Sequence, residues 1–285
     1  MLFRICIADD IGHTSGEVND GPMLICYDQE PILTPYNFEL FDYIQQNCQA
    51  PFILLTTECD SDPLNLIKYK YKWPTAYYFH HAFAAHDWYR GYRYDARLQD
   101  PQQRKLVKKY ITFNRLTSNA RVYRSIFIGS LVQHNLLEHG YVSYSETCPD
   151  GGHYRENLSQ AVDDKIIRPE QAKSTISYLD QLQEPLRIDF QNAIPNGSFL
   201  LSAIEQSQQS FCQVVTETCY WERKCHLTEK IFKPIVSRMP STPLETAHNL
   251  RYLRSYGFKT FSNWIDESYD DIERSEEHTS ELQSH

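Results

Sequence analysis

The stretch SFCQVVTETCYWERKCHLTEKIFKPI, Ser210–Ile235, decides the fold, because a β-branched run is followed by a polar loop and an apolar helical segment. We expect a strand over 211–218 and a helix over 228–236. Strands that alternate with helices build parallel sheets, and open α/β sheets bind ligands at the carboxyl ends of their strands. The stretch therefore predicts a ligand site where the strand ends and the helix begins.

The polar residues at this junction suit a phosphorylated ligand. Thr228 can cap the helix, whose positive N-terminal end favours phosphate. Lys230 adds a positive charge, and the carboxylates of Glu217 and Glu229 can accept hydrogen bonds from ribose or sugar hydroxyl groups. In the alternative interpretation, Thr228 and Glu229 only cap the helix and Lys230 is solvated.

The rest of the chain repeats this alternation, which predicts an α/β fold with two Rossmann-like domains in tandem. Expected strands lie at 2–8, 22–28, 51–57, 76–83, 110–114, 141–145 and 258–261. Expected helices lie at 36–47, 63–72, 118–137 and 245–257. A polar stretch at 97–109 marks the boundary, so we expect domains at 1–105 and 106–273. The segment MPSTPLETA (239–247) lacks the buried apolar strand that this fold calls for.

The composition is that of a globular protein, with 41% hydrophobic and 23% charged residues. No apolar run approaches the roughly 20 residues of a membrane span, and the N-terminus lacks the pattern of a secretory signal. A formal charge of -9 argues against a nucleic-acid partner. Eight cysteines without a Cys-x-x-Cys pair favour a reducing, cytoplasmic setting.

The last residues, RSEEHTSELQSH (274–285), resemble the translation of a common sequencing adapter. We therefore treat 274–285 as an artefactual tail and leave it out of the fold argument. It follows that we expect the natural sequence to be truncated and to continue beyond Glu273.

The stretch VVTETCYWERKCHLTEKIFKPI resembles the donor-binding segment of α-1,3-fucosyltransferases. In that family an acidic residue at a strand end precedes an aromatic-Val/Ile-Thr-Glu-Lys helix start, and Glu217, Thr228, Glu229 and Lys230 fall on the matching positions. The resemblance implies a GT-B fold, in which two Rossmann-like domains face a cleft, with Glu229 and Lys230 in contact with a nucleotide sugar. The family's Phe-Glu-Asn is here Thr-Glu-Thr, which leaves the sugar open.

Two further segments extend the resemblance. In FNRLTSNARVYRS (113–125), Asn114 and Arg121 resemble the family's pyrophosphate-binding pair, while Arg115 and Arg124 are further cations suited to phosphate. The alternative is that these arginines lie on the surface of an amphipathic helix. The segment 247–273 is similar to the closing segment of phage and marine glycosyltransferase-like proteins.

The third matching segment is LLTTECDSDP (54–63), which resembles the Gly-Glu-Asn-x-x-Pro turn of the family's acceptor domain. The resemblance implies that Glu58 is the general base, which takes the proton of the attacking acceptor hydroxyl. Thr57 replaces the family's Gly, and YDQEPI (27–32) offers Asp28 or Glu30 as competing carboxylates. The base is therefore Glu58, Asp28 or Glu30.

Other polar residues were weighed as ligand sites. Asp60-Ser61-Asp62 has the Asp-x-Asp form that holds a divalent metal in GT-A glycosyltransferases, but it stands before a proline and a helix, where a turn and a cap are expected. In HHAFAAHDW (80–88), His81 and Asp87 are interpreted as acceptor-side residues. The spacing of cysteine and histidine matches no zinc pattern.

The sequence and the resemblance together predict a metal-independent, fucosyltransferase-like glycosyltransferase. The expected partners are a nucleotide-sugar donor, a GDP-sugar first, and a glycan or similar acceptor, with no cofactor besides the donor. The two alternatives are a non-catalytic module that binds glycan or nucleotide on the same scaffold, and a GT-A-type transferase that uses Asp60 and Asp62 to hold a metal.

Overall fold

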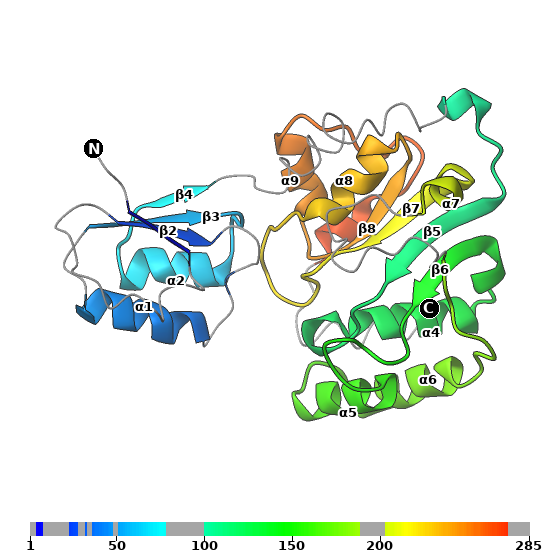
Figure 1. Ribbon diagram of the computed structural model, residues 1–285, viewed down its shortest axis with the longest axis horizontal. Coiled ribbons are helices and arrows are strands. Elements are labelled where there is room, and N and C mark those ends of the chain that lie inside the picture. The colour runs from blue at the N-terminus through cyan, green and yellow to red at the C-terminus, as the bar shows by residue number, and fades with distance from the viewer. Residues whose placement is uncertain are drawn as a thin grey trace. The chain divides into compact units, whose positions relative to one another are not determined.

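The computed structural model describes residues 4–7, 23–27, 32, 36–47, 51–77, 100–188 and 203–272. These residues form two four-stranded sheets, and every strand pair in them is parallel. Helices connect the strands (Figure 1), which confirms the α/β fold class. The chain divides into two compact units, the first formed by Met1–Phe83 with Arg223–Leu227 and the second by Ala84–Glu222 with Thr228–His285. The division falls at residue 83, whereas the sequence pattern placed it near 105.

The first unit holds a sheet whose strand order follows the sequence, β1-β2-β3-β4. Its strands are β1 (Arg4–Ile7), β2 (Met23–Tyr27), β3 (Phe52–Thr56) and β4 (Thr75–Tyr77). Helix α1 (Tyr36–Asn47) joins β2 to β3, and α2 (Asp62–Lys70) joins β3 to β4. The connections β2–α1–β3 and β3–α2–β4 run in the same direction across the sheet, and such parallel crossovers are right-handed in nearly all proteins. Both helices accordingly lie on the same face of the sheet (Figure 1).

Local sequence explains where α2 begins. The Ser61 side chain accepts a hydrogen bond from Leu64 N at 3.2 Å, and Pro63 occupies the first turn, where a missing N–H costs nothing. The expected turn and cap at Asp60-Ser61-Asp62 are confirmed, with Asp60 in the left-handed region at φ 48. Leu64 and Ile67 of α2 are buried and join a core that includes Phe41 and Trp73.

The second unit holds the sheet β6-β5-β7-β8. Its strands are β5 (Lys108–Asn114), β6 (Gly140–Tyr144), β7 (Ser210–Thr216) and β8 (Ser241–Leu244). Its α-helices are α4 (Tyr123–Gln133), α5 (Tyr154–Asp163), α6 (Pro169–Leu179), α7 (Ile204–Gln208), α8 (Glu229–Val236) and α9 (Asn249–Ser255). Short 3-10 turns lie at Pro101–Gln103, Asn119–Arg121, Leu137–His139 and Ser268–Asp271.

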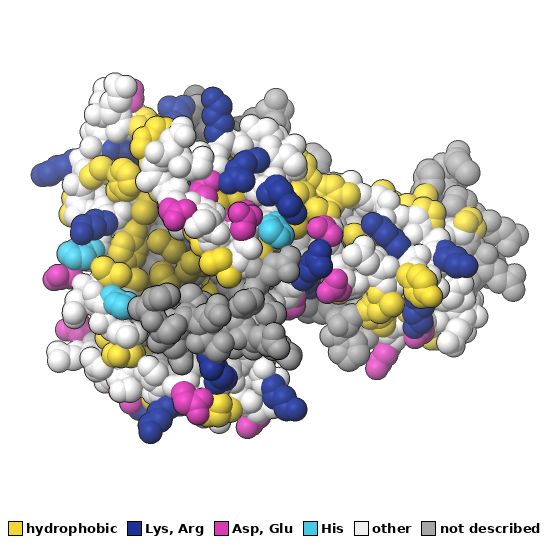
Figure 2. Space-filling model, turned by 180° about the vertical axis from the view of Figure 1, so that it is seen from behind, with side chains coloured by type: hydrophobic (Ala, Val, Ile, Leu, Met, Phe, Trp, Pro, Cys, Tyr) yellow, Lys and Arg dark blue, Asp and Glu magenta, His cyan; other side chains and the backbone are white. Residues whose placement is uncertain are grey.

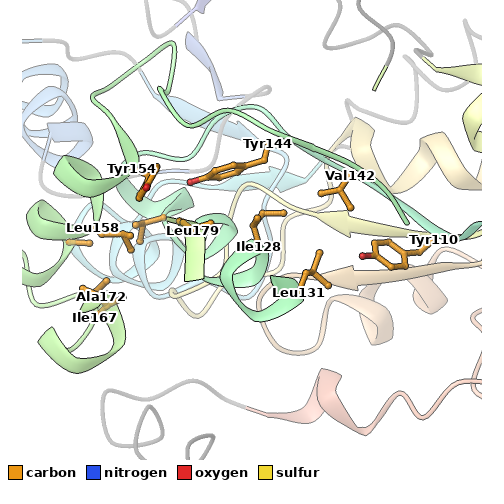
Figure 3. Packing of buried hydrophobic residues seen from close by; sticks show 12 residues of the cluster. Tyr110, Ile128, Leu131, Val142, Tyr144, Tyr154, Leu158, Ile167, Ala172 and Leu179 are labelled. Carbon is orange, nitrogen blue, oxygen red and sulfur yellow. The ribbon is translucent and has the colours of Figure 1, made fainter. Parts of the chain in front are cut away.

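The main core of the second unit lies between this sheet and α4, α5 and α6. Val142 and Tyr144, both on β6, lie against Ile128 of α4. The cluster continues to Leu158 on α5 and Leu179 on α6 (Figure 3). Ile128 and Leu158 have no exposed surface. Helices α8 and α9 lie on the other side of the strands from α4, α5 and α6 (Figure 1).

Three expectations for the second unit are corrected. The helix expected at 118–137 is a 3-10 turn followed by α4, which ends at Gln133. The strand expected at 258–261 does not form, because Phe261 N and the Thr260 hydroxyl donate to the Glu267 carboxylate at 2.6 and 2.8 Å instead of to a strand. The segment 239–247 does form a strand, β8, whose Pro243 is tolerated because β8 lies at the edge of the sheet.

Helix α9 begins four residues later than the pattern suggested. The Asp270 carboxylate accepts hydrogen bonds from Leu250 N at 3.0 Å and Arg251 N at 3.3 Å, which satisfies the first N–H groups of this helix. Because the cap comes from a residue distant in sequence, the local pattern could not place this boundary.

Candidate functional site

The strand order of the second unit places a topological switch point at the carboxyl ends of β5 and β7. The chain leaves β5 towards β6 at one edge and leaves β7 towards β8 at the other, so the connections diverge between these two neighbouring strands. Open α/β sheets bind ligands at such a point. Asn114 is the last residue of β5, and Glu217 directly follows β7. The structure thus brings two of the predicted donor-site residues to adjacent strand ends.

Thr228 links the end of β7 to the start of α8. Its hydroxyl donates to Glu217 Oε2 at 2.5 Å and accepts from Lys230 N at 3.2 Å and from Lys230 Nζ at 3.1 Å. A hydroxyl group offers one hydrogen and two lone pairs, so these three contacts use its full capacity. The predicted helix cap is confirmed, and the same atom also fixes Glu217 and Lys230 next to each other.

The Lys230 ammonium is held by several oxygens at once. Besides Thr228, Lys230 Nζ lies 3.1 Å from Thr218 Oγ1, 3.4 Å from Glu229 Oε1 and 4.0 Å from Glu217 Oε2. Its side chain keeps 28% of its surface exposed, whereas Glu217 keeps 1%. One cation therefore stands at the N-terminus of α8, partly open to solvent, with its position set by surrounding side chains.

Each of the two strand ends carries a buried side-chain oxygen that has no hydrogen-bond partner among the residues that the structure describes. These oxygens are Glu217 Oε1 and Asn114 Oδ1, while Asn114 Nδ2 is held at 3.2 Å by both Thr112 Oγ1 and the Ser143 carbonyl. Unsatisfied acceptors are rare in protein interiors and often mark the place of a ligand or a water. Burial raises the pKa of Glu217, although nearby Lys230 and the Thr228 hydrogen bond oppose this rise.

Arg124 has a structural position rather than the exposed one expected of a phosphate ligand. It is buried, and its guanidinium donates to the carbonyls of Leu116 at 2.9 Å and of Thr216 and Glu217 at 2.8 Å. These carbonyls lie just after β5 and at the end of β7, so Arg124 links the carboxyl ends of these two strands. Arg115 is exposed and Arg121 is half-buried in the turn before α4.

Sequence reasoning missed Tyr123 and Tyr220, which support the same strand end. Their rings are stacked, with centroids 4.0 Å apart and planes 2° from parallel. The Tyr123 hydroxyl donates to the Glu217 carbonyl at 2.5 Å, and burial raises the pKa of this phenol. The aromatic residues in the loop after β7 were the available signal, but nothing in the local pattern shows that Tyr220 meets Tyr123.

Lys233 is a third residue that the sequence did not single out. It lies one helical turn after Glu229 on α8, the spacing at which side chains share a helix face. Burial lowers the pKa of Lys233 to about 8, and the neighbouring Lys230 also lowers it, whereas Glu229 and Glu217 raise it. The ammonium makes no hydrogen bond within the part of the chain that the structure describes. The spacing from Glu229 is the signal that could have identified it.

In the first unit, Glu58 is buried and both of its carboxylate oxygens accept hydrogen bonds. Oε2 accepts from Ile32 N at 2.6 Å, and Oε1 accepts from the Ser61 hydroxyl that caps α2. Glu58 keeps 0% of its surface exposed, so an acceptor hydroxyl could reach the carboxylate only if neighbouring residues moved. The competing bases Asp28 and Glu30 and the acceptor-side residues His81 and Asp87 lie outside the described residues.

A cavity of about 440 Å³ lies elsewhere in the second unit. Its lining includes Ile235 of α8, Ser241 at the start of β8, and Leu253 of α9. It is therefore at the end of α8 and the beginning of β8, whereas the Glu217 and Thr228 network is at the opposite end of both elements. Seen from behind, hydrophobic side chains gather in a hollow of the larger unit (Figure 2). The candidate site at the ends of β5 and β7 therefore rests on the strand order and on the residues gathered there, and not on this cavity.

Two other searches concern metals and membranes. Across the described ranges, no group of three or more His, Cys, Asp or Glu side chains is arranged to hold a metal ion. None of the helices in those ranges combines the length and apolar character needed to cross a membrane. Comparison of the chain with models of protein families, with curated proteins and with solved structures found no match.

Proposed function

We propose that this protein is a glycosyltransferase that binds a nucleotide-sugar donor at the carboxyl ends of β5 and β7. The observation that carries the proposal is the pair of buried oxygens of Glu217 and Asn114 at neighbouring strand ends, which have no hydrogen-bond partner within the described residues. The other oxygen of Glu217 lies 4.0 Å from the Lys230 ammonium. A nucleotide sugar offers hydroxyl groups that can donate to such oxygens, and a diphosphate that a cation and a helix N-terminus stabilise. A nucleotide sugar combines both features in one molecule.

Each residue of the network has a part in the proposed chemistry. Lys230 and Arg121 bind the diphosphate and stabilise the negative charge that grows on it as the sugar leaves. Glu217 and Glu229 accept hydrogen bonds from ribose or sugar hydroxyls, and Asn114 holds the donor on the β5 side. Arg124 acts indirectly, because it fixes the backbone at the carboxyl ends of β5 and β7. These positive groups belong to the protein, so the reaction needs no metal.

The acceptor side of the proposal places a carboxylate base in the first unit. The acceptor is a hydroxyl group of a glycan or a similar molecule, with His81 and Asp87 among the residues that contact it. The acceptor oxygen attacks the anomeric carbon while its proton passes to Glu58, Asp28 or Glu30, and the nucleotide diphosphate departs. A GT-B arrangement of the two units, with the reaction in the cleft between them, is part of this proposal.

Saturation-transfer NMR against GDP-, UDP-, CMP- and dTDP-sugars tests the donor site. We expect one nucleotide class, GDP first, to give a signal with the parent protein that Lys230→Ala weakens. Lys173→Ala is a matched control, because Lys173 is exposed on α6. Equal signals from all three proteins, or no signal from any sugar nucleotide, would contradict the proposal. Repeating the positive assay in excess EDTA separates it from a metal-dependent transferase built on Asp60 and Asp62.

A non-catalytic binding module is the second candidate, and one observation favours it. Both oxygens of Glu58 are engaged in hydrogen bonds that fix Ile32 and cap α2, as expected for a structural carboxylate. A module of this kind would bind the donor and neither transfer nor hydrolyse its sugar. If the protein binds the donor but leaves it unchanged after long incubation with a panel of glycans, the second candidate is supported over the first.

A further inference from the structure

Cys59 and Cys225 face each other within the first unit, to which the short segment Arg223–Leu227 belongs. Cys59 N donates to the Cys225 carbonyl at 2.9 Å, and Cys225 N donates to the Cys59 carbonyl at 3.0 Å. This reciprocal pair is the hydrogen-bonded position of an antiparallel bridge, where Cα atoms lie about 5.5 Å apart and side chains leave on the same face. Disulfides span Cα distances of about 4.4–6.8 Å, so the usual Cα separation of such a pair lies within the range that a disulfide bridges.

The surroundings hold this pair in place on both sides. Next to it, Thr57 Oγ1 lies 3.5 Å from His226 Nδ1, and Lys224 Nζ donates to the Ile32 carbonyl at 3.1 Å. Lys224 and His226 are buried, so the residues before and after Cys225 are both anchored. Backbone anchoring matters because a disulfide forms readily only where its two ends need no movement to meet.

We propose that Cys59 and Cys225 form a reversible disulfide by exchange with a small-molecule disulfide such as oxidised glutathione. Both residues are thiols in this structure. Cys59 is the attacking residue, because it is half-buried while Cys225 is buried. The hydrogen bond from the Cys225 side chain lowers the pKa of Cys59, which increases its thiolate fraction.

The exchange proceeds in two balanced steps. The Cys59 thiolate attacks one sulfur of glutathione disulfide, so that a mixed disulfide forms and one glutathione leaves as a thiolate. The Cys225 sulfur, after losing its proton, then attacks the Cys59 sulfur, and the second glutathione leaves. One small disulfide is thereby reduced to two thiols while two protein thiols are oxidised. The product covalently fixes the segment that ends one residue before Thr228, and it forms whether or not the protein is a transferase.

Peptide mapping of the full-length protein tests the pairing. The reduced chain is incubated with oxidised glutathione, quenched in acid, alkylated and digested with trypsin and a Glu-specific protease without reductant. Cuts after Glu58 and Lys68 release CDSDPLNLIK, and cuts after Lys224 and Glu229 release CHLTE. We expect these two peptides joined in the oxidised sample, absent from the reduced sample, and separated again by dithiothreitol.

Two variants sharpen the result. Cys225→Ser is expected to retain one glutathione on Cys59, because the second exchange step is lost, whereas Cys212→Ser is expected to give the joined peptides as the parent does. Full alkylation of both Cys59 and Cys225 after oxidation would overturn the proposal. So would a parent protein that accumulates glutathione on Cys59 without the joined peptides, because that result shows that the two sulfurs do not meet.

Discussion

Glu58 and Lys224 bind the two polar groups of the same backbone residue, Ile32. Glu58 Oε2 accepts from Ile32 N at 2.6 Å, and Lys224 Nζ donates to the Ile32 carbonyl at 3.1 Å. Glu58 and Lys224 keep 0% and 3% of their surface exposed, so two charged side chains serve the backbone inside the first unit. Arg124 does the same in the second unit, where it binds three carbonyls. Charged residues that look functional in the sequence can therefore hold the fold.

Arg124→Met tests this structural role. The substitution removes the guanidinium but keeps much of the side-chain volume. It removes the Arg124 donor from the carbonyls of Leu116 and Thr216, and it leaves the Glu217 carbonyl with the Tyr123 hydroxyl alone. We expect the free energy of unfolding to fall by about 3–5 kcal/mol, as when one partner of a buried charged interaction is removed. Urea denaturation measures it. Arg115→Met is the control, because Arg115 is exposed and should change stability by less than about 0.5 kcal/mol.

Lys230→Ala and Arg121→Ala test the donor site. Each removes a cation proposed to bind the diphosphate, and we expect each to weaken nucleotide-sugar binding by about 1.5–3 kcal/mol, the range of charge-assisted hydrogen bonds. Isothermal titration calorimetry with the sugar nucleotide found in the screen measures the loss. Unchanged affinity in both variants would place the donor elsewhere. A loss in Lys230→Ala alone would keep the α8 site and remove Arg121 from it.

The sequence could predict those parts of the fold whose signals are local. The helix at 36–47 and the cap at Thr228 follow from residue spacing and from one side chain, and both are confirmed. The capping of α9 by Asp270 and the stacking of Tyr220 on Tyr123 could not be predicted, because both depend on contacts between residues distant in sequence. For the same reason, the pattern of arginines at 113–125 could not tell buried Arg124 from exposed Arg115.

Lys233→Met tests the effect of a buried cation at the site. Burial lowers the folded-state pKa of Lys233 from 10.5 to about 8, so below pH 8 the folded protein carries a charge that is costly to desolvate. The shift corresponds to at most roughly 3 kcal/mol, and solvent screening of a half-buried group reduces this. We expect Lys233→Met to raise the free energy of unfolding by about 1–3 kcal/mol at neutral pH.

The stability advantage of Lys233→Met is expected to depend on pH in a definite direction. Because the unfolded chain binds the Lys233 proton more tightly than the folded chain, the parent protein gains stability as the pH rises from about 8 towards 10.5. The advantage of Lys233→Met should therefore shrink across that window. Urea denaturation of both proteins below pH 8 and near pH 10.5 measures the difference. As a control, Lys173 is exposed, so the stability difference between the parent protein and Lys173→Met should not depend on pH in this window. If the stability advantage of Lys233→Met stayed constant with pH, the buried-charge explanation would be contradicted.

Glu58→Gln separates a catalytic role from a structural one. A glutamine can still accept from Ile32 N through its oxygen and can donate its amide N–H to the Ser61 hydroxyl, which has lone pairs available. We therefore expect Glu58→Gln to cost less than about 1 kcal/mol of stability, whereas Glu58→Ala, which leaves Ile32 N unpaired, should cost about 1–3 kcal/mol. The glutamine variant is thus folded, and it lacks only the ability to take up a proton.

If Glu58 is the general base, turnover of Glu58→Gln should fall by roughly 10²–10⁴-fold, the usual share of general base catalysis. Donor affinity should not change, because the proposed donor site belongs to the second unit. Asp28→Asn and Glu30→Gln are measured in parallel as the competing bases. Parental turnover in Glu58→Gln, together with an inactive Asp28→Asn or Glu30→Gln, would assign the base to the YDQEPI segment. It would leave Glu58 with the role that its two hydrogen bonds already give it, which is to fix Ile32 and to orient Ser61 at the start of α2.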